Sequence, residues 1–103
     1  MTVHCFAWTD LPEDVAENGV AKRRVRGAGA EWVRIAIPAG TRAARHSHDH
    51  EQLVQVISGS GTLVTEQGSR EFGPGSLFHF PAHVWHEAEF TTATVLVETN
   101  LPA

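Results

Sequence analysis

Glycine and proline interrupt the sequence roughly every ten residues from Glu31 onward, and this pattern most restricts how the chain can fold. The intervals hold short runs rich in β-branched and aromatic residues: EWVRIAI, EQLVQVIS, GTLVTE, SREF, SLFHF, VWHEAEF and ATVLVET. Such runs are typical of strands, and none has the length or period of a long helix. The pattern therefore predicts an all-β sandwich or barrel. We further expect EQLVQVIS and GTLVTE to pair as a hairpin through residues 58–61.

The 103 residues suffice for one domain with a single modest core. Residues 1–30 differ from the rest, because an acidic, turn-rich stretch (TDLPEDVAENG) precedes a basic one (KRRVRGAGA). We expect residues 1–30 to form an N-terminal arm, either an edge strand or a wrapping segment. Residues 31–103 are expected to form one barrel.

Composition excludes several classes of function. The formal net charge of −4 argues against a nucleic-acid partner bound through bulk positive charge. No apolar run approaches the length of a transmembrane helix, so we expect no membrane partner. The N-terminal residues lack the basic and apolar segments of a signal peptide, and Cys5 is the single cysteine. Because one cysteine cannot form an internal disulfide, the sequence predicts a cytoplasmic protein.

Histidine is unusually frequent, with seven residues against eight lysines and arginines together, and six of the seven lie between His46 and His86. Alternate residues of an extended strand share a face, so the stretch HSHDHEQ places four side chains together: His46, His48, His50 and Gln52. Imidazoles two residues apart on a strand can bind one zinc, nickel, iron, copper or manganese ion. By itself, however, HSHDH is more often a polar surface loop.

The spacing around these histidines strengthens the metal-site interpretation. Gly40, His46, His48, Gln52 and Gly59 follow the order G(x)5HxH(x)3Q(x)6G, and Gly75, Pro81 and His86 follow G(x)5P(x)4H. The two strings resemble the two motifs of the cupin superfamily, G(x)5HxH(x)3–4E(x)6G and G(x)5PxG(x)2H(x)3N, over roughly residues 35–98. The sequence departs from these motifs at three positions: Gln52 replaces Glu, His83 replaces Gly and Phe90 replaces Asn.

Membership of this superfamily implies a small jelly-roll barrel, also called a double-stranded β-helix, whose metal ligands line the interior. The resemblance assigns three histidines, His46, His48 and His86, as ligands of one divalent transition metal ion per chain: zinc, nickel, manganese, iron or copper. The family's fourth ligand is Glu, and Gln52 stands at that position with Glu51 beside it. Strand alternation favours Gln52, because it shares the face of the first two histidines. Gln52 would bind directly or through a water, or would only hydrogen-bond a ligating imidazole.

Three neutral imidazoles and a neutral amide would leave the full charge on a divalent ion, which favours Lewis-acid chemistry over oxidation of the metal. The first hypothesis is therefore a lyase or isomerase that acts on a small polar organic anion, either a sugar acid or an enolisable carboxylate or carbonyl. The stretch HSHDHEQ also resembles uronate-linearising sugar-acid cupins and the sensory cupin domains of AraC-type regulators. The alternatives are a non-catalytic small-molecule sensor or binding module, a metal-dependent dioxygenase, and a structural dimer with a vestigial site.

Other residues would complete a substrate pocket. His79 and Glu98 are candidates for general acid–base catalysis if their side chains face the barrel interior. An inward Arg34 would hold a substrate carboxylate, although an exposed arginine is the more common outcome. Four further candidates for substrate contacts, each otherwise a core or rim residue, are Phe78, Phe80, Trp85 and His50. The resemblance also implies a homodimer that pairs through outer sheets.

Overall fold

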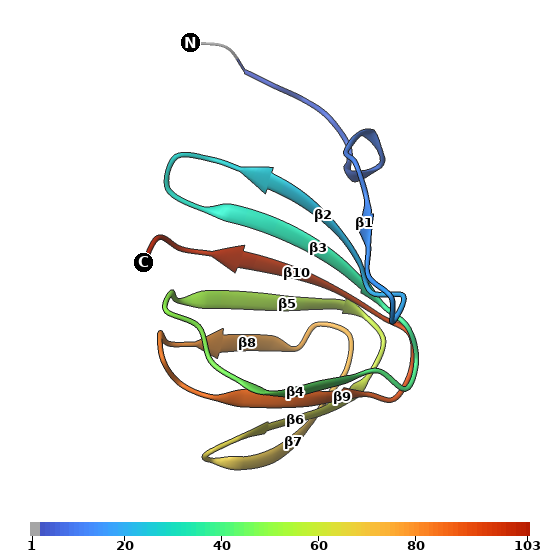
Figure 1. Cartoon of the computed structure of the whole chain (residues 1–103), viewed down its shortest axis with the longest axis vertical. Coiled ribbons are helices and arrows are strands. Elements are labelled where there is room, and N and C mark those ends of the chain that lie inside the picture. The colour runs from blue at the N-terminus through green and yellow to red at the C-terminus, as the bar shows by residue number, and fades with distance from the viewer. Residues whose placement is uncertain (1–2) are drawn as a thin grey trace.

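The computed structural model describes residues 3–103 and confirms the predicted all-β jelly roll (Figure 1). One short 3-10 helix, η1 (Trp8–Asp10), precedes the strands. In chain order, the strands are β1 (Asp14–Val15), β2 (Ala21–Arg26), β3 (Glu31–Ile37), β4 (Arg42–His46), β5 (Gln52–Ser58), β6 (Gly61–Thr65), β7 (Gly68–Phe72), β8 (Leu77–Phe80), β9 (His86–Phe90) and β10 (Thr94–Asn100). No helix within residues 3–103 is long and apolar enough to cross a membrane.

Two antiparallel sheets each combine strands from distant parts of the chain. The six-stranded sheet has the order β1-β2-β3-β10-β5-β8, and the four-stranded sheet has the order β4-β9-β6-β7. β10 lies between β3 and β5, and β9 lies between β4 and β6 (Figure 1). Because each late strand pairs with early ones, the two histidine motifs of the sequence meet in one barrel.

The predicted hairpin between β5 and β6 is wrong. The two strands belong to different sheets, since β5 pairs with β10 and β8 whereas β6 pairs with β7 and β9. Residues 58–61 carry the chain from one sheet to the other, with Gly59 at a φ of 92°. A Cβ on Gly61 would collide with the carbonyl oxygen of Glu89 on β9. These glycines therefore permit a close crossing of two backbones rather than a tight turn.

Residues of the N-terminal arm form the edge of the six-stranded sheet. β2 pairs with β3 along its whole length, and the two-residue β1 pairs with β2. Lys22 and Arg24 lie opposite the buried Ile35 and Val33, so alternation directs both basic side chains toward the inner face of the sheet. Residues 1 and 2 of the predicted arm lie outside the described residues.

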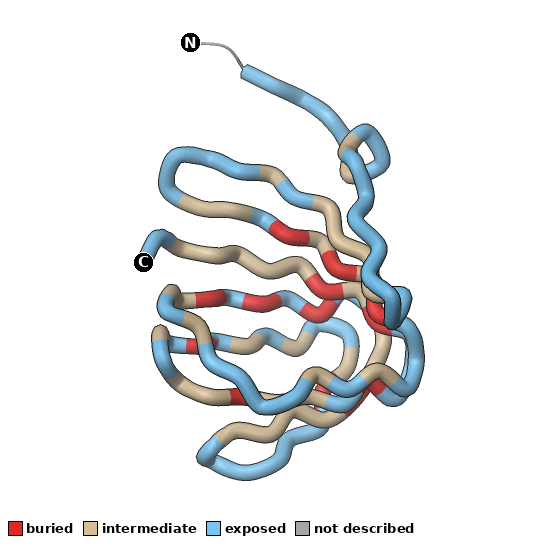
Figure 2. Tube along the Cα trace, viewed as in Figure 1, coloured by how far each residue is buried: buried red, intermediate tan, exposed pale blue. Residues whose placement is uncertain are grey.

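The core lies between the inner faces of the two sheets, with most of its side chains supplied by β3, β5 and β10 (Figure 2). Its buried members are Val33, Ile35, Ile37, Val54, Val56, Phe72, Phe80, Phe90 and Leu96. Every second residue of β5 is buried from Gln52 to Val56, which is the alternation expected of a strand with one face in the core. Burial of each large apolar side chain stabilises the folded state by about 1.5–3 kcal/mol, so this core keeps the two sheets packed together.

Candidate metal centre

Three histidines that are far apart in the sequence meet at one end of the barrel. His46 ends β4 and His86 begins β9, and the two residues are direct cross-strand partners. His48 follows in the loop after β4, and its ring centroid lies 4.9 Å from that of His46 and 5.4 Å from that of His86. One ring nitrogen from each residue lies within 4.8 Å of the others, which is close enough for the three to share one ion. We refer to His46, His48 and His86 as the histidine trio.

The tautomer of His46 suits a metal ligand. Its Nδ1 lies 2.6 Å from the carbonyl oxygen of Ala44. Because a carbonyl oxygen only accepts hydrogen bonds, Nδ1 carries the proton and donates it. Nε2 therefore keeps its lone pair, and the hydrogen bond fixes the orientation of the ring, as is typical of metal-binding histidines.

His86 is held neutral inside the barrel. Its side chain is buried and stacks on the Phe80 ring, with centroids 3.7 Å apart and planes 4° apart. Burial, together with the nearby charges of His46 and His48, lowers the pKa of His86 to about 4. Burial and the neighbouring histidines also lower the pKa of His48. Nδ1 of His86 is buried and has no hydrogen-bond partner among residues 3–103, and the neutral ring keeps a lone pair on one of its two nitrogens.

Gln52 is directed inward as predicted, but the single strand expected over residues 46–52 is wrong. β4 ends at His46, His48 and His50 lie in the loop that follows, and Gln52 begins β5 in the other sheet. Gln52 is only 4% exposed, whereas the next residue, Leu53, is 44% exposed. Its Nε2 donates a hydrogen bond of 2.8 Å to Oδ1 of Asn100. Its Oε1 accepts no hydrogen bond from any described residue, so the amide oxygen is available to an ion or to a water.

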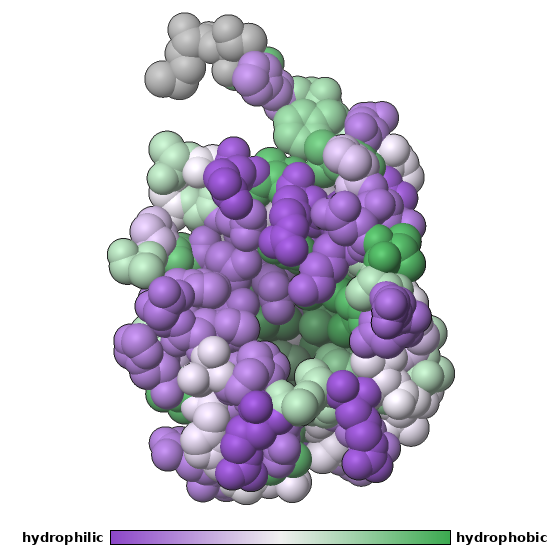
Figure 3. Space-filling view, in the orientation of Figure 1, coloured by the Kyte–Doolittle hydropathy of each residue, from purple (hydrophilic) through white to green (hydrophobic). Residues whose placement is uncertain are grey.

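A cavity of about 220 Å³ adjoins the trio. Its lining includes His46 and His86, the charged Lys22, Arg42 and Glu98, and the apolar Ile35, Phe78, Phe80 and Leu96. A hollow with a hydrophobic floor and a hydrophilic rim is visible on the face shown in Figure 3. Pockets for drug-sized ligands are roughly 300–1,000 Å³, so this cavity suits a smaller molecule. A larger cavity of about 520 Å³ runs along β7 and β8, but its lining contains no member of the trio.

Glu98 and Lys22, two of the three charged residues that line this cavity, carry opposite charges. Glu98 lies on β10 opposite the buried Val33 and Val54, so its side chain is on the inner face of the sheet. This is the orientation that a role in acid–base catalysis requires. Burial raises the pKa of the Glu98 carboxyl, and the charges of Lys22 and Arg24 partly oppose that rise. Lys22 makes no salt bridge within the described part of the chain. The sequence pattern did not single out Lys22, although three of the four basic residues of AKRRVR, Lys22, Arg24 and Arg26, alternate and so share a face.

Two predicted site residues lie on the outside of the barrel. Arg34 sits between the buried Val33 and Ile35 on β3, so its side chain faces away from the cavity and cannot hold a substrate there. His79 is also directed outward, because its neighbour Phe80 on β8 is directed inward. Its side chain is 56% exposed, and its Nε2 lies 2.6 Å from Oε2 of Glu51. The expected role of His79 in proton transfer therefore does not fit this arrangement.

The remaining pocket candidates divide between the cavity and its surroundings. Phe78 and Phe80 line the cavity. Trp85 does not, because its ring lies beneath the guanidinium of Arg45, with 3.7 Å from Cζ to the ring centroid. His50 lies next to the trio, with its ring centroid 5.2 Å from that of His48, but it lines a separate cavity together with Glu31 and Asn100. Its buried Nε2 has no partner among the described residues.

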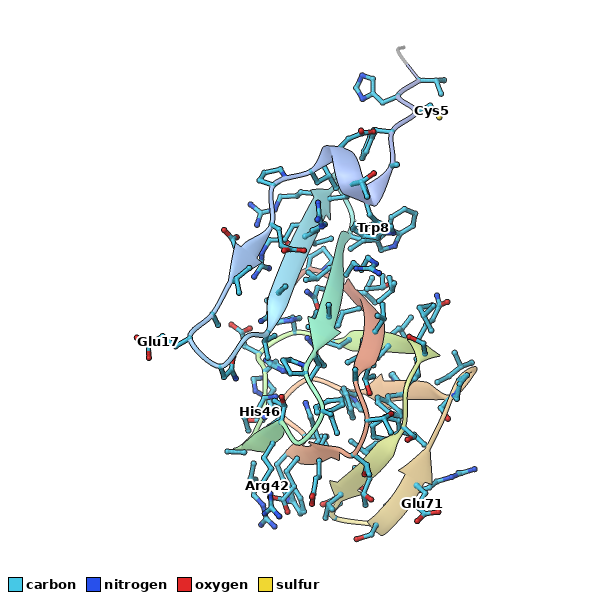
Figure 4. All side chains as sticks on the ribbon, turned by 90° about the vertical axis from the view of Figure 1, so that its right-hand side faces the viewer. Cys5, Trp8, Glu17, Arg42, His46 and Glu71 are labelled. Carbon is cyan, nitrogen blue, oxygen red and sulfur yellow. The ribbon has the colours of Figure 1, made fainter. Side chains whose placement is uncertain are left out.

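Figure 4 shows where His46 and Cys5, two potentially reactive side chains, lie in the molecule. His46 and Arg42 lie together on β4, whereas the exposed Cys5 lies at the opposite end of the molecule. Arg42 forms a salt bridge of 3.5 Å with Glu89 on the neighbouring β9. The only cluster of histidine, cysteine and carboxylate side chains that could hold an ion, among residues 3–103, is the histidine trio.

Comparison with known proteins agrees with this architecture. The sequence matches the cupin domain over residues 33–99, and no curated protein shows significant sequence similarity to the chain. An RmlC-like cupin from Shewanella frigidimarina superposes with a TM-score of 0.88 at 22% identity, covering 99% of this chain and 93% of that one. Ectoine synthase from P. lautus gives 0.85 at 19% identity, covering 97% and 78%. Oxalate decarboxylase from Bacillus subtilis, whose structure contains Mn(II) centres, gives 0.80 at 22% identity, covering 98% and 30%.

These structural likenesses show the fold alone, because the identities are low. The sequence match carries more, since it spans over half of the chain and contains the histidine trio and Gln52. The chain therefore belongs to the cupin domain family.

Proposed function

We propose that this chain is a metal-dependent enzyme that acts on a small polar organic anion, either a sugar acid or an enolisable carboxylate or carbonyl. One observation carries the proposal: a single cavity brings the carboxyl of Glu98 and the ammonium of Lys22 beside His46 and His86. A potential proton carrier and an anion-binding charge thus adjoin a potential metal site.

The residues present fit one divalent transition metal ion. His46, His48 and His86 would hold it, with Gln52 as the fourth ligand directly or through a water. When bound, such an ion supplies Lewis acidity that polarises a substrate oxygen. All four donors are neutral, so they offset none of the ion's charge, which favours this role over a change of oxidation state. Imidazole binds zinc, nickel, manganese, iron and copper, and the choice among them is left to measurement.

The chain's own residues would bind the substrate and move its proton. Lys22 would hold an anionic group of the substrate, because its ammonium has no carboxylate partner among the described residues. The ionised Glu98 would take a proton from the carbon next to the polarised group and return it to the product. Burial, which raises the pKa of Glu98, makes it a stronger base than an exposed carboxylate. Phe78 and Phe80 would exclude water from the reacting end of the cavity.

Oxalate decarboxylase offers a precedent for this substrate class within the same fold. By its name it acts on a small organic anion, and its structure contains Mn(II) centres. We propose the same class of substrate, a small organic anion, for this chain, but not the same reaction.

Hydrogen–deuterium exchange tests the proposal. The metal-loaded protein is incubated in D2O with a panel of small 2-oxo and hydroxy acids, and loss of the carbon-bound proton is followed by NMR. We expect exchange with at least one acid, and about 100-fold slower exchange with Glu98→Gln, which is the low end of what a general base contributes. Lys22→Met should raise the acid concentration needed for half-maximal rate, whereas Arg34→Ala, on the outer face, should change neither quantity. A protein that binds metal and acid but never exchanges a proton would be a binding module instead.

The homodimer and the cytoplasmic location remain predictions. Four large apolar side chains are exposed on the outer face of the six-stranded sheet and offer a surface for a second copy: Trp32, Leu53, Ile57 and Leu77. We expect light scattering to give the mass of a dimer, and Ile57→Lys to give a monomer. The exposed Cys5 should be a free thiol, as is usual in the cytoplasm.

A further inference from the structure

Beyond the ligands themselves, we infer that Asn100 is a positioning residue that turns the amide oxygen of Gln52 toward the histidine trio. The inference rests on the proposed metal site. It concerns how an amide, in place of the family's carboxylate, can serve at that site at all.

A row of polar side chains crosses four strands of the six-stranded sheet. Gln52 on β5 pairs with Asn100 on β10, Asn100 pairs with Glu31 on β3, and Glu31 pairs with Arg26 on β2. All four occupy inner-face positions, because each alternates with inward residues of its own strand. In this row, a hydrogen bond of 2.8 Å joins Gln52 to Asn100, one of 3.2 Å joins Asn100 to Glu31, and one of 3.1 Å joins Glu31 to Arg26.

The direction of every hydrogen bond follows from the arginine end. Arg26 only donates, and a second guanidinium, that of Arg24, lies 3.6 Å from Oε1 of Glu31. Burial raises the pKa of Glu31, but the hydrogen bonds from Arg26 and Asn100 and the two guanidinium charges outweigh it, so the pKa lies below its usual value. Glu31 is therefore an ionised acceptor, and Asn100 must present its Nδ2 to it. Oδ1 of Asn100 then faces β5 and accepts from Nε2 of Gln52.

This constraint matters because the two ends of an amide have nearly the same shape. If the side-chain amide of Gln52 were flipped by half a turn, it would fill the same space. It would then direct its NH2 group toward the cation, and an NH2 group that only donates hydrogen bonds cannot bind a cation. The acceptor on Asn100 holds Nε2 of Gln52 and so leaves Oε1 for the ion or its water. A glutamate at this position would need no such partner, since its two oxygens are equivalent. The row therefore compensates for the exchange of Glu for Gln in the first motif.

A double-mutant cycle on metal affinity tests the inference without any substrate. Four proteins are compared: wild type, Asn100→Leu, Gln52→Glu, and the double variant. Each is titrated in its metal-free form with Co(II), whose visible absorption reports the ligand set, and the dissociation constant is measured against a competing chelator. In the Gln52 background, we expect Asn100→Leu to weaken binding about 10- to 100-fold and to alter the absorption spectrum. In the Gln52→Glu background, we expect the same substitution to cause no loss of affinity, because the carboxylate needs no orienting donor and the Oδ1 of Asn100 would face it as a second acceptor.

Asn100→Asp provides rescue, because its carboxylate still accepts from Nε2 of Gln52 although it cannot donate to Glu31. We expect its Co(II) affinity to exceed that of Asn100→Leu, and thermal melting of the metal-free proteins checks that all of them fold. Equal losses in both backgrounds, or no loss in either, would overturn the positioning role while leaving the metal site intact. If wild type binds no Co(II), the proposed function itself fails, and that outcome is distinct from the previous two.

Discussion

Two histidines lie on opposite sides of β8: His86 of the trio packs against Phe80 on its inner face, and His79 pairs with Glu51 on its outer face. Inside, His86 stacks on Phe80, has no carboxylate partner among the described residues, and is neutral because its pKa is lowered to about 4. Outside, His79 forms an exposed pair with Glu51 at 2.6 Å. One step along β8 separates Phe80 from His79. The difference teaches that strand parity, more than local composition, decides whether a side chain of β8 meets the buried His86 or the solvent.

The largest expected effect comes from removing one histidine on each side. His86→Ala should abolish stoichiometric metal binding, a loss greater than the roughly 10–100-fold that follows from removing a hydrogen-bond partner of a ligand. His79→Ala should leave the metal content unchanged. Elemental analysis of both purified variants checks the contrast. Equal metal loss in the two would mean that the two regions do not differ in the way the structure indicates.

Lowering the pH should destabilise the metal-free protein through the buried His86, which sharpens the comparison with the exposed His79. In the unfolded chain, His86 takes up a proton as the pH falls below its ordinary pKa of 6.5. In the folded protein, it takes up a proton only when the pH falls to its lowered pKa of about 4. The unfolded state thus binds more protons in this window, so the free energy of unfolding should fall as the pH drops from 6.5 to 4. His48, whose pKa is also lowered, acts in the same direction.

Urea unfolding of the metal-free protein at several pH values measures this loss, with His86→Leu as the comparison. The variant lacks the titrating group and should lose less stability across the window. An identical slope for wild type and variant would show that His86 does not titrate as its burial implies.

The smallest effect belongs to the outer pair. Because both side chains are about half exposed, Glu51→Gln should lower the free energy of unfolding by less than about 1 kcal/mol, and added salt should reduce even that difference. Urea unfolding at low and high ionic strength gives both quantities. A loss of several kcal/mol, or any loss of metal, would mean that Glu51 reaches into the barrel.

The inward direction of Gln52 was predicted from the sequence, but for a reason that the structure contradicts, because β4 ends at His46 and a loop separates it from Gln52 at the start of β5. The meeting of His46, His48 and His86 was predicted from the spacing of the two motifs and their resemblance to the cupin family, rather than from contacts within either motif. Arg34 and His79 were open, because alternation names two faces of a strand but not which one meets the core. The buried residues of β3 and β8 settle both.

The features that escaped prediction depend on pairing between strands far apart in the chain. Gly59 and Gly61 look like a hairpin turn locally, yet β9 and β10 decide where the neighbouring strands go. Lys22 reaches the cavity only because β2 pairs with β3, and Asn100 reaches Gln52 only because β10 lies beside β5. No spacing within a motif carries that information.

The polar row also lies almost wholly outside the part of the chain that matches the family. The match covers residues 33–99 and contains Gln52, whereas Arg26 and Glu31 precede it and Asn100 follows it. On the positioning role proposed for Asn100, the residues that orient Gln52 lie in segments that can vary independently of the motif histidines. Substitutions in the flanks can alter which ion the centre prefers, or how strongly it acidifies what it binds, while every ligand stays in place. Relatives with identical ligands can then differ in chemistry for reasons that a comparison of their shared domain would never reveal.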